Sequence, residues 1–334
     1  MTSLITLDDY ERAARECIPP ASWEYIHSGA GDEHTIRWNR EAYGRIRLHP
    51  RVLNDVHQID TRVELLGQRL AHPILLAPVA AQVLAHPDGE IETAKGALKA
   101  RAGMILSSYT SKPVEDVVDV GASPLWFQLY FQERKATREL VPRVIDAGCT
   151  ALCVTVDTPT GGARDRISRA AFEFPDLPYR IVQPGENPCT WDDIAWMRDA
   201  AKVPLILKGI LHPDDAERAI EAGAAAIVVS NHGGRNLDTV PATIDVLPRI
   251  AERVAGRVPL LIDGGIRRGT DVLKALALGA GAVMIGRPYV FGLAVAGANG
   301  VANVIEILRK EFEMAMALCG RTSVAQLDRS VIWT

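Results

Sequence analysis

A histidine and an arginine in one short segment, Ser-Asn-His-Gly-Gly-Arg at 230–235, give the most specific chemical signal in the sequence. His232 can act as a general base near neutral pH, and Arg235 can hold a carboxylate through two parallel hydrogen bonds. Asp157, in a second polar segment, could hold the imidazole and stabilise its protonated form. Arg164 lies a few residues further on and could share the same site. The predicted chemistry is proton removal by a histidine beside a carboxylate clamp.

Two glycine-containing segments, Asp-Gly-Gly at 263–265 and Gly-Arg-Pro at 286–288, are typical of an anion site. Glycine lets main-chain N–H groups approach an anion closely, and Arg267 or Arg287 can add a charged contact. Either segment alone could be an ordinary tight turn, but the two together favour a phosphorylated cofactor or substrate. Lys208 ends an otherwise apolar run, so its ammonium group needs an anionic partner unless it reaches the surface.

Eight short apolar runs alternate with helical patterns and must position these residues. Each run is continuously apolar, as expected for a parallel strand that is covered on both faces. The runs cover residues 73–80, 103–109, 125–131, 151–158, 204–210, 226–233, 259–265 and 282–288. Helical patterns between them include 88–101, 134–147, 213–222 and 269–278. Eight strand–helix units predict an α/β protein with a closed (β/α)8 TIM barrel, in which polar residues at the strand ends face the active-site mouth.

The length of 334 residues fits one barrel of about 250 residues with extensions. We expect a single domain, with an N-terminal helical extension over 1–70, the barrel over 71–320 and a tail over 321–334. Within the extension, residues 63–70 suggest a hairpin that turns at a glycine and closes the bottom of the barrel. The irregular segment 159–190, after the fourth strand, is predicted to form a lid over the site.

Composition and charge narrow the class of protein. Hydrophobic residues make up 48% and charged residues 23% of the chain, as in folded globular proteins, and the net charge is only −4. Nucleic acid and membrane surfaces are therefore not expected as partners. The five cysteines form no CxxC pair and no secretory signal is visible, so a cytoplasmic protein is expected. The histidines show no metal-binding spacing, and the uncharged stretch 288–305 is interpreted as a buried turn and helix.

Several of these segments together resemble the family of FMN-dependent 2-hydroxy acid oxidases and dehydrogenases, which includes glycolate oxidase, lactate oxidase, mandelate dehydrogenase and flavocytochrome b2. The resemblance rests on SNHGGR at 230–235, DGGIRRG at 263–269, GRP at 286–288, TVDTP at 155–159 and WFQLY at 126–130. It extends over nearly the whole chain. It implies that the protein binds FMN and oxidises an (S)-2-hydroxy acid to the 2-oxo acid, with O2 reoxidising the flavin and giving H2O2.

The resemblance also implies roles for individual residues. His232 would be the base, whether it removes the proton from the α-carbon or from the hydroxyl group, and Asp157 would orient it. The catalytic residues would be His232, Asp157 and Tyr130, and the substrate would contact Tyr25, Tyr109, Tyr130, Arg164 and Arg235. FMN would contact Pro78, Val79, Ala80, Ser107, Gln128, Thr155, Lys208, Ser230, Asp263, Gly264, Gly265, Arg267, Gly286 and Arg287. No metal is implied, and a homotetramer is expected because family members are often tetramers.

Departures from the family pattern concern the substrate side of the site. Glycolate oxidases carry Trp at the position of Tyr109, whereas lactate oxidases resemble this chain there. Gly161-Gly162 leave space beside the substrate's α-substituent. Ile167 replaces an Asp that is usual in the family, which predicts a weaker anchoring of Arg164. Alternatives to an oxidase remain: a dehydrogenase that uses a quinone or a carrier protein, a non-redox FMN enzyme on the same barrel, or a non-catalytic FMN-binding protein. The side chain of the hydroxy acid is also open.

Overall fold

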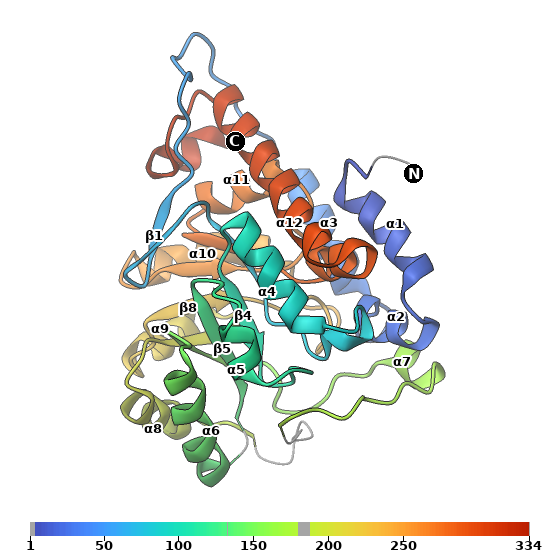
Figure 1. Ribbon diagram of the computed structural model, residues 1–334. Coiled ribbons are helices and arrows are strands. Elements are labelled where there is room, and N and C mark those ends of the chain that lie inside the picture. The colour runs from blue at the N-terminus through green and yellow to red at the C-terminus, as the bar shows by residue number, and fades with distance from the viewer. Residues whose placement is uncertain (1–3, 132, 180–187, 334) are drawn as a thin grey trace.

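A barrel of eight parallel strands forms the centre of the molecule (Figure 1). The structure is a computed structural model that describes residues 4–131, 133–179 and 188–333. The strands follow one another around the barrel in chain order, and the last pairs with the first. They are β3 (Ile74–Leu76), β4 (Met104–Ser107), β5 (Leu125–Tyr130), β6 (Leu152–Thr155), β7 (Leu205–Ile210), β8 (Ala226–Val229), β9 (Leu260–Ile262) and β10 (Ala282–Ile285). Each lies inside one of the eight apolar runs, so the predicted (β/α)8 barrel is confirmed.

Helices surround the barrel and bury the outer face of its strands. They are α4 (Gly89–Ala100), α5 (Val114–Val118), α6 (Arg134–Ala147), α8 (Trp191–Ala201), α9 (Pro213–Glu221), α10 (Thr243–Val254), α11 (Gly269–Ala277) and α12 (Arg287–Leu318). The four predicted helical patterns correspond to α4, α6, α9 and α11, with ends that agree within one residue. Every residue of β4, β6, β8 and β10 is buried, which explains why the strands read as continuous apolar runs.

A small hairpin closes the amino-terminal end of the barrel. Its strands β1 (Val63–Leu65) and β2 (Gln68–Leu70) pair antiparallel around a turn at Gly67, which has a φ of +74°. Leu65 and Leu70 belong to the same buried cluster as the side chains inside the barrel. The Gln68 side chain binds Thr150, which precedes β6. The predicted hairpin and its position are therefore both confirmed.

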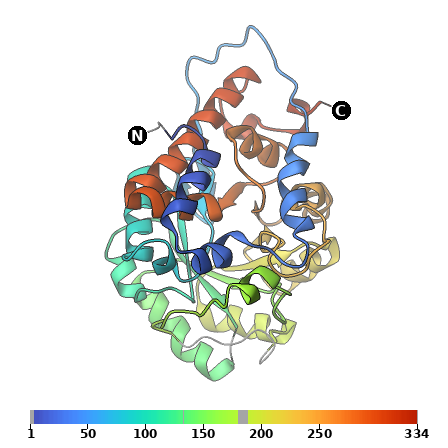
Figure 2. The same ribbon diagram turned by 90° about the vertical axis from the view of Figure 1, so that its right-hand side faces the viewer.

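The N-terminal extension forms three helices that lie against one side of the barrel (Figure 2). α1 (Leu7–Cys17) begins at a capping box of Thr6 and Asp9 and packs along α12. α2 (Pro20–His27) contacts the short lid helix α7 (Asp165–Arg169), and both lie on the right of Figure 1. α3 (His34–Arg45), which was not predicted, packs against α10. This arrangement brings residues from before the barrel to the carboxyl ends of its strands.

The chain from α1 to the tail shares one hydrophobic core. The tail contains the 3-10 helices η2 (Val324–Gln326) and η3 (Arg329–Val331), and a third, η1 (Gln82–Leu84), follows β3. Isolated bridges join Leu48 to Ile332 and Asp60 to Ser323, so the tail returns to the N-terminal extension. These contacts join the two ends of the described chain.

The uncharged stretch 288–305 lies in α12, whose helix is interrupted where Ala296 and Gly297 leave helical geometry. By length and composition α12 is the one helix of the described chain that could cross a membrane. More than half of its apolar window is buried, and it packs against α4, α1 and α11. The interpretation of this stretch as a buried turn and helix agrees with that packing.

Candidate active site

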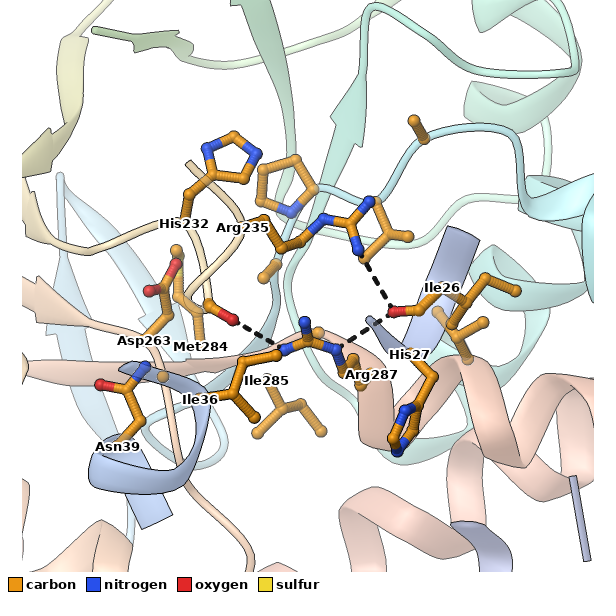
Figure 3. A pocket seen from close by; sticks show the side chains of 18 of the residues that line it. Ile26, His27, Ile36, Asn39, His232, Arg235, Asp263, Met284, Ile285 and Arg287 are labelled. Atoms are coloured by element: carbon orange, nitrogen blue, oxygen red, sulfur yellow. Dashed lines mark hydrogen bonds between the residues drawn. The ribbon is translucent and has the colours of Figure 1, made fainter. Parts of the chain in front are cut away.

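A cavity of about 640 Å³ opens at the carboxyl ends of the barrel strands, and Figure 3 shows part of its lining. It brings together most of the residues singled out from the sequence. Those that line it are Tyr25, Pro78, Val79, Ala80, Ser107, Tyr109, Tyr130, Thr155, Arg164, Lys208, His232, Arg235, Asp263, Gly264, Gly265, Arg267, Gly286 and Arg287. Gln128, Asp157 and Ser230 lie behind this wall, each hydrogen-bonded to a lining residue.

His232 and Asp157 form the acid–base pair expected from the sequence. His232 Nδ1 lies 3.0 Å from Asp157 Oδ1 although the two residues follow different strands, β8 and β6. Burial would raise the pKa of Asp157, but the nearby His232 and Lys208 outweigh it and hold the pKa below its usual value. Burial lowers the pKa of His232 more than Asp157 raises it. The imidazole is therefore neutral at pH 7 and able to accept a proton.

Tyr130 contacts the other ring nitrogen of His232. Its hydroxyl oxygen lies 3.2 Å from His232 Nε2. Burial, followed by the charge of Asp157, raises the pKa of Tyr130 above its usual value, so the phenol keeps its proton and can donate it in a hydrogen bond. With Nδ1–H donated to Asp157, Nε2 is the acceptor. This network leaves Nε2 as the basic atom that faces the cavity.

Two backbone features hold this pair in place. His232 has a φ of +57°, followed by Gly233 and Gly234 at +62° and +74°, so the chain turns sharply back after β8. A left-handed conformation is costly for a residue other than glycine and is typical of functional sites. On β7, the register shifts at Gly209, where an added Cβ would come within 2.5 Å of Asp157. Glycine at this position leaves the space that Asp157 occupies.

Arg235 and Arg164 meet at one side of the cavity. Arg235 Nη1 donates to the main-chain oxygens of Tyr25 at 2.7 Å and Ser28 at 3.0 Å, and its guanidinium stacks on the Tyr25 ring. Arg164 Nε donates to the main-chain oxygen of Arg235 at 3.1 Å. Burial, and then the charge of Arg164, lower the pKa of Arg235 to about 10. A buried guanidinium group beside a second positive charge is suited to bind an anion.

The lid adds aromatic side chains to this end of the cavity. Phe172 stacks on Tyr25 with ring centroids 4.6 Å apart, and Phe174 meets Tyr25 edge-on at 4.9 Å. Tyr109 and Tyr130 lie side by side at 4.7 Å. The described part of 159–190 therefore borders the cavity, as expected of a lid, while residues 180–187 of that segment lie outside the described residues.

Lys208 is buried at the end of β7 and has two polar partners. Its Nζ lies 2.9 Å from Ser230 Oγ and 3.2 Å from Asp263 Oδ2. Burial would lower the pKa of Lys208, but Asp263 and Asp157 outweigh it and raise the pKa, so the ammonium group stays charged. The sequence predicted an anionic partner for Lys208, and the carboxylate of Asp263 is one such partner. Lys208 still borders the cavity.

The polar groups of the cavity fit a bound FMN. Gln128 Nε2 and Asp263 Oδ1 are buried and have no hydrogen-bond partner among the described residues, so a ligand with donors and acceptors would satisfy them. Arg287 donates to the main-chain oxygens of Ile26, Gly233 and Ser28, and the Ile26 oxygen also accepts from Arg235 (Figure 3). Burial, and then Arg235, lower the pKa of Arg287 to about 9. Carbonyl groups carry no net charge, so a phosphate beside this guanidinium would supply the missing countercharge.

The sequence-based reasoning missed one wall of the cavity, which the N-terminal extension supplies. Its residues there are Glu11, Ile26, His27, Glu33, Ile36, Arg37, Asn39 and Arg40. Asn39 is buried and exchanges two hydrogen bonds, of 2.9 and 2.8 Å, with Asn231 in the loop after β8. The helical spacing of Thr35, Asn39, Ala42 and Tyr43, all buried, was the signal that could have revealed α3.

Two further expectations concern metal and anchoring. Within the described ranges, no group of three His, Cys, Asp or Glu side chains is placed to hold a metal ion. Arg164 was expected to be weakly anchored because Ile167 replaces an acidic residue. The structure holds Arg164 by other means, through the main-chain oxygen of Arg235 and, at 3.5 Å, the side chain of Asn236.

Comparisons with known proteins show which family the chain resembles over its length. The family model described as FMN-dependent dehydrogenase matches residues 14–334. The chain is 46% identical to L-lactate oxidase of Nostoc sp., over 99% of both proteins. It is 44% identical to peroxisomal (S)-2-hydroxy-acid oxidase GLO4 of Oryza sativa subsp. japonica, over 99% of this chain and 96% of that protein. A crystal structure of mandelate oxidase with benzoyl-formic acid superposes with a TM-score of 0.94 at 40% identity, over 99% of this chain and 98% of the other.

Proposed function

Because the chain belongs to the family of FMN-dependent dehydrogenases, we propose that it oxidises (S)-2-hydroxy acids to 2-oxo acids, with FMN as cofactor and O2 as electron acceptor. The observation that carries this proposal is the shared cavity of His232 and Arg235: a neutral imidazole, oriented by Asp157 at 3.0 Å, beside a guanidinium suited to a carboxylate. A substrate with a hydroxyl group on the carbon next to its carboxylate matches these two functions.

The arginines bind the substrate in this proposal. Arg235 is held in place by main-chain oxygens of α2 and the residues after it, so its direction does not depend on the ligand. A carboxylate beside it removes the repulsion between Arg235 and Arg164 and makes charge-assisted hydrogen bonds. Tyr25, stacked under Arg235, and Tyr109 border the same space. The acid is bound by its charge, and its side chain faces the aromatic residues of the lid.

His232 holds the proton that leaves the substrate. Its Nε2 and the Tyr130 hydroxyl group lie 3.2 Å apart. A substrate hydroxyl group in the cavity that contacts both could donate to Nε2 and accept from the phenol, in place of their direct hydrogen bond. Once Nε2 is protonated, the ring carries a positive charge beside Asp157, whose lowered pKa keeps it ionised. Asp157 therefore stabilises the protonated state and lowers the barrier to proton removal.

The opposite side of the cavity would hold the cofactor. Gln128 and Asp263 offer unpaired polar atoms, Lys208 is charged, and Arg267 and Arg287 lie near the glycines of the anion segments. Oxidation of the hydroxyl carbon to a ketone removes two electrons and two protons, and bound FMN supplies the two-electron acceptor from which O2 takes the electrons to give H2O2.

An anaerobic titration of the purified protein tests the proposal. (S)-lactate, glycolate, longer 2-hydroxy acids and (S)-mandelate are added in turn while the flavin absorbance is followed, and air is then admitted. We expect one class of hydroxy acid to bleach the flavin and air to restore the absorbance within seconds, with formation of H2O2. Slow recovery in air would replace O2 by another acceptor, and a yellow protein that no hydroxy acid bleaches would refute the proposal.

We infer a cytoplasmic homotetramer for the state in which the enzyme works. All five cysteines are free thiols, which fits a reducing compartment. The apolar side chains of Val52 and Leu53 are 81% and 102% exposed, and the neighbouring Arg51 N–H binds the main-chain oxygen of the exposed Leu318. A second copy of the chain could cover this apolar area. Light scattering coupled to size exclusion and fractionation of the source cells test the two inferences, and a monomer or an organellar location would refute them.

A further inference from the structure

Arg166 connects the lid to the N-terminal extension, and neither the barrel fold nor the residues of the catalytic centre account for this contact. It lies on α7, two residues after Arg164. Its Nε donates to Glu24 Oε2 at 2.6 Å, and its Nη1 donates to both carboxylate oxygens of Glu33, at 3.1 and 3.2 Å. The three side chains are between 22% and 33% exposed. A partly buried guanidinium shared by two carboxylates is held far more firmly than an exposed ion pair.

The partners of Arg166 are themselves fixed. Glu33 Oε1 accepts a hydrogen bond of 2.8 Å from the Gly29 N–H, which follows α2. Glu24 precedes Tyr25, whose main-chain oxygen binds Arg235. A second contact supports the same junction, because the Gly31 N–H donates to the Ala163 main-chain oxygen at 2.9 Å. The lid is therefore attached to the segment that also holds Arg235.

Arg164 is the residue that this attachment positions. It caps the amino end of α7, and its Nε reaches the main-chain oxygen of Arg235 at 3.1 Å. α7 has only five residues and none of them is buried, although the partly exposed Ile167 packs against the hydrophobic core. Without Arg166, the position of α7 would depend on this packing, on the Ala163 contact and on the stacked rings of Phe172 and Tyr25.

We propose that Arg166 is a positioning residue that fixes the lid helix on Glu24 and Glu33 and thereby holds Arg164 beside Arg235 for binding of the substrate carboxylate. This inference rests on the proposed oxidation of hydroxy acids. It predicts that loss of Arg166 weakens binding of the acid but leaves proton removal by His232 unchanged once the acid is bound. Among the described residues, the side chains of His232 and Asp157 are held by hydrogen bonds to each other and to Tyr130, and none of these partners lies on α7.

Variants R166Q and R166K, compared with R169Q, test the proposal in anaerobic flavin reduction by the acid that wild type oxidises. Arg169 is a matched control, since it lies on the same helix but its side chain is 77% exposed and lies 3.7 Å from Asp165, an exposed residue of the same helix. For R166Q we expect the substrate concentration at half-maximal rate to rise about tenfold, with the limiting rate within about twofold of wild type. R166K should recover part of the loss because it keeps the charge, and R169Q should match wild type.

A double variant separates positioning from a general loss of structure. If Arg166 acts through Arg164, R166Q should add little to the loss already caused by R164Q, whereas independent effects would multiply. E24Q, which removes one partner, should reproduce part of the R166Q effect if R166Q itself does not fold. Equal binding by R166Q and R169Q, a fall in the limiting rate alone, or multiplied losses in the double variant would each overturn the proposal. A wild-type protein that no hydroxy acid reduces would instead refute the proposed function.

Discussion

Replacing Asp157 by asparagine removes one charge from the catalytic centre and very little else. The side chain keeps its size, and an amide oxygen can still accept the hydrogen bond that His232 Nδ1 now donates across 3.0 Å. The charge matters most when His232 has taken the substrate's proton, because the ring is then a cation in a buried site. D157N therefore tests whether electrostatic stabilisation of that cation contributes to the rate.

The expected loss follows from the distance. Two unit charges about 3 Å apart interact by about 5 kcal/mol at an effective dielectric constant near 20. The amide retains a neutral hydrogen bond worth about 1 kcal/mol. Since the proton is only partly transferred in the transition state, we expect about 3 kcal/mol of lost stabilisation, or a rate of flavin reduction lower by roughly 10²–10³.

The assay is anaerobic flavin reduction across a range of pH, at saturating hydroxy acid for the limiting rate and at low hydroxy acid for kcat/KM. His232 must be neutral to act as a base, so kcat/KM rises with pH through the pKa of the free imidazole. Burial already lowers that pKa, and Asp157 raises it in part. Loss of the carboxylate lowers it further, so the acidic limb of the D157N profile should move to lower pH while its plateau falls.

Asp165 provides the control, since it is an exposed lid carboxylate that pairs with the exposed Arg169. D165N should leave both the plateau and the acidic limb of the pH profile unchanged. Binding of the 2-oxo acid product should stay within about threefold of wild type in D157N, because the clamp arginines are untouched. A plateau lowered less than fivefold, or a limb that moves to higher pH, would refute the reasoning.

Three further substitutions test other parts of the molecule. Arg235→Lys should raise the KM for the hydroxy acid about tenfold because bidentate binding is lost, and an unchanged KM would assign the carboxylate to another residue. Gly209→Ala should slow flavin reduction at least about tenfold, since its Cβ would displace Asp157, whereas Gly223→Ala, equally strained but facing a flexible arginine, should not. Glu11→Gln should reduce stability by about 1–2 kcal/mol at pH 7, because a neighbouring histidine, despite burial, lowers the pKa of this carboxyl to about 2. That contribution is complete above the unfolded pKa near 4.5 and is lost as the pH falls towards 2, so melting curves of the two proteins that differ as much at pH 3 as at pH 7 would contradict it.

The barrel could be predicted from the sequence because its strands are covered on both faces. Burial of every residue in strands such as Leu152–Thr155 leaves a continuous apolar run, and a chain of such runs is typical of few folds. The pairing of Asp157 with His232 followed from the same rule, since both residues stand just after strands whose carboxyl ends meet. In both cases the apolar runs of the sequence mark the strands, and the barrel brings the ends of those strands together.

The contacts of the N-terminal extension could not be predicted in the same way. No repeating rule relates a helix before the barrel to a particular strand end, so the positions of Asn39 and of Glu33 depend on packing between segments far apart in the chain. For the same reason the contacts of Arg166 could not be predicted, because its carboxylate partners lie outside the lid, in the N-terminal extension.

The contacts within the barrel and the contacts of the N-terminal extension and lid support different functions of the site. Residues on barrel strands and the loops directly after them carry the proton chemistry, and their geometry is fixed by a buried core. The carboxylate clamp is different, since Arg235 takes its direction from the main-chain oxygens of Tyr25 and Ser28, and Arg164 takes its position from a lid tied to Glu24. Changes in the extension or the lid should therefore alter which acids bind, and how tightly, before they alter the rate of proton removal. Substitutions where the lid meets the N-terminal extension could therefore change the substrate while the barrel stays the same.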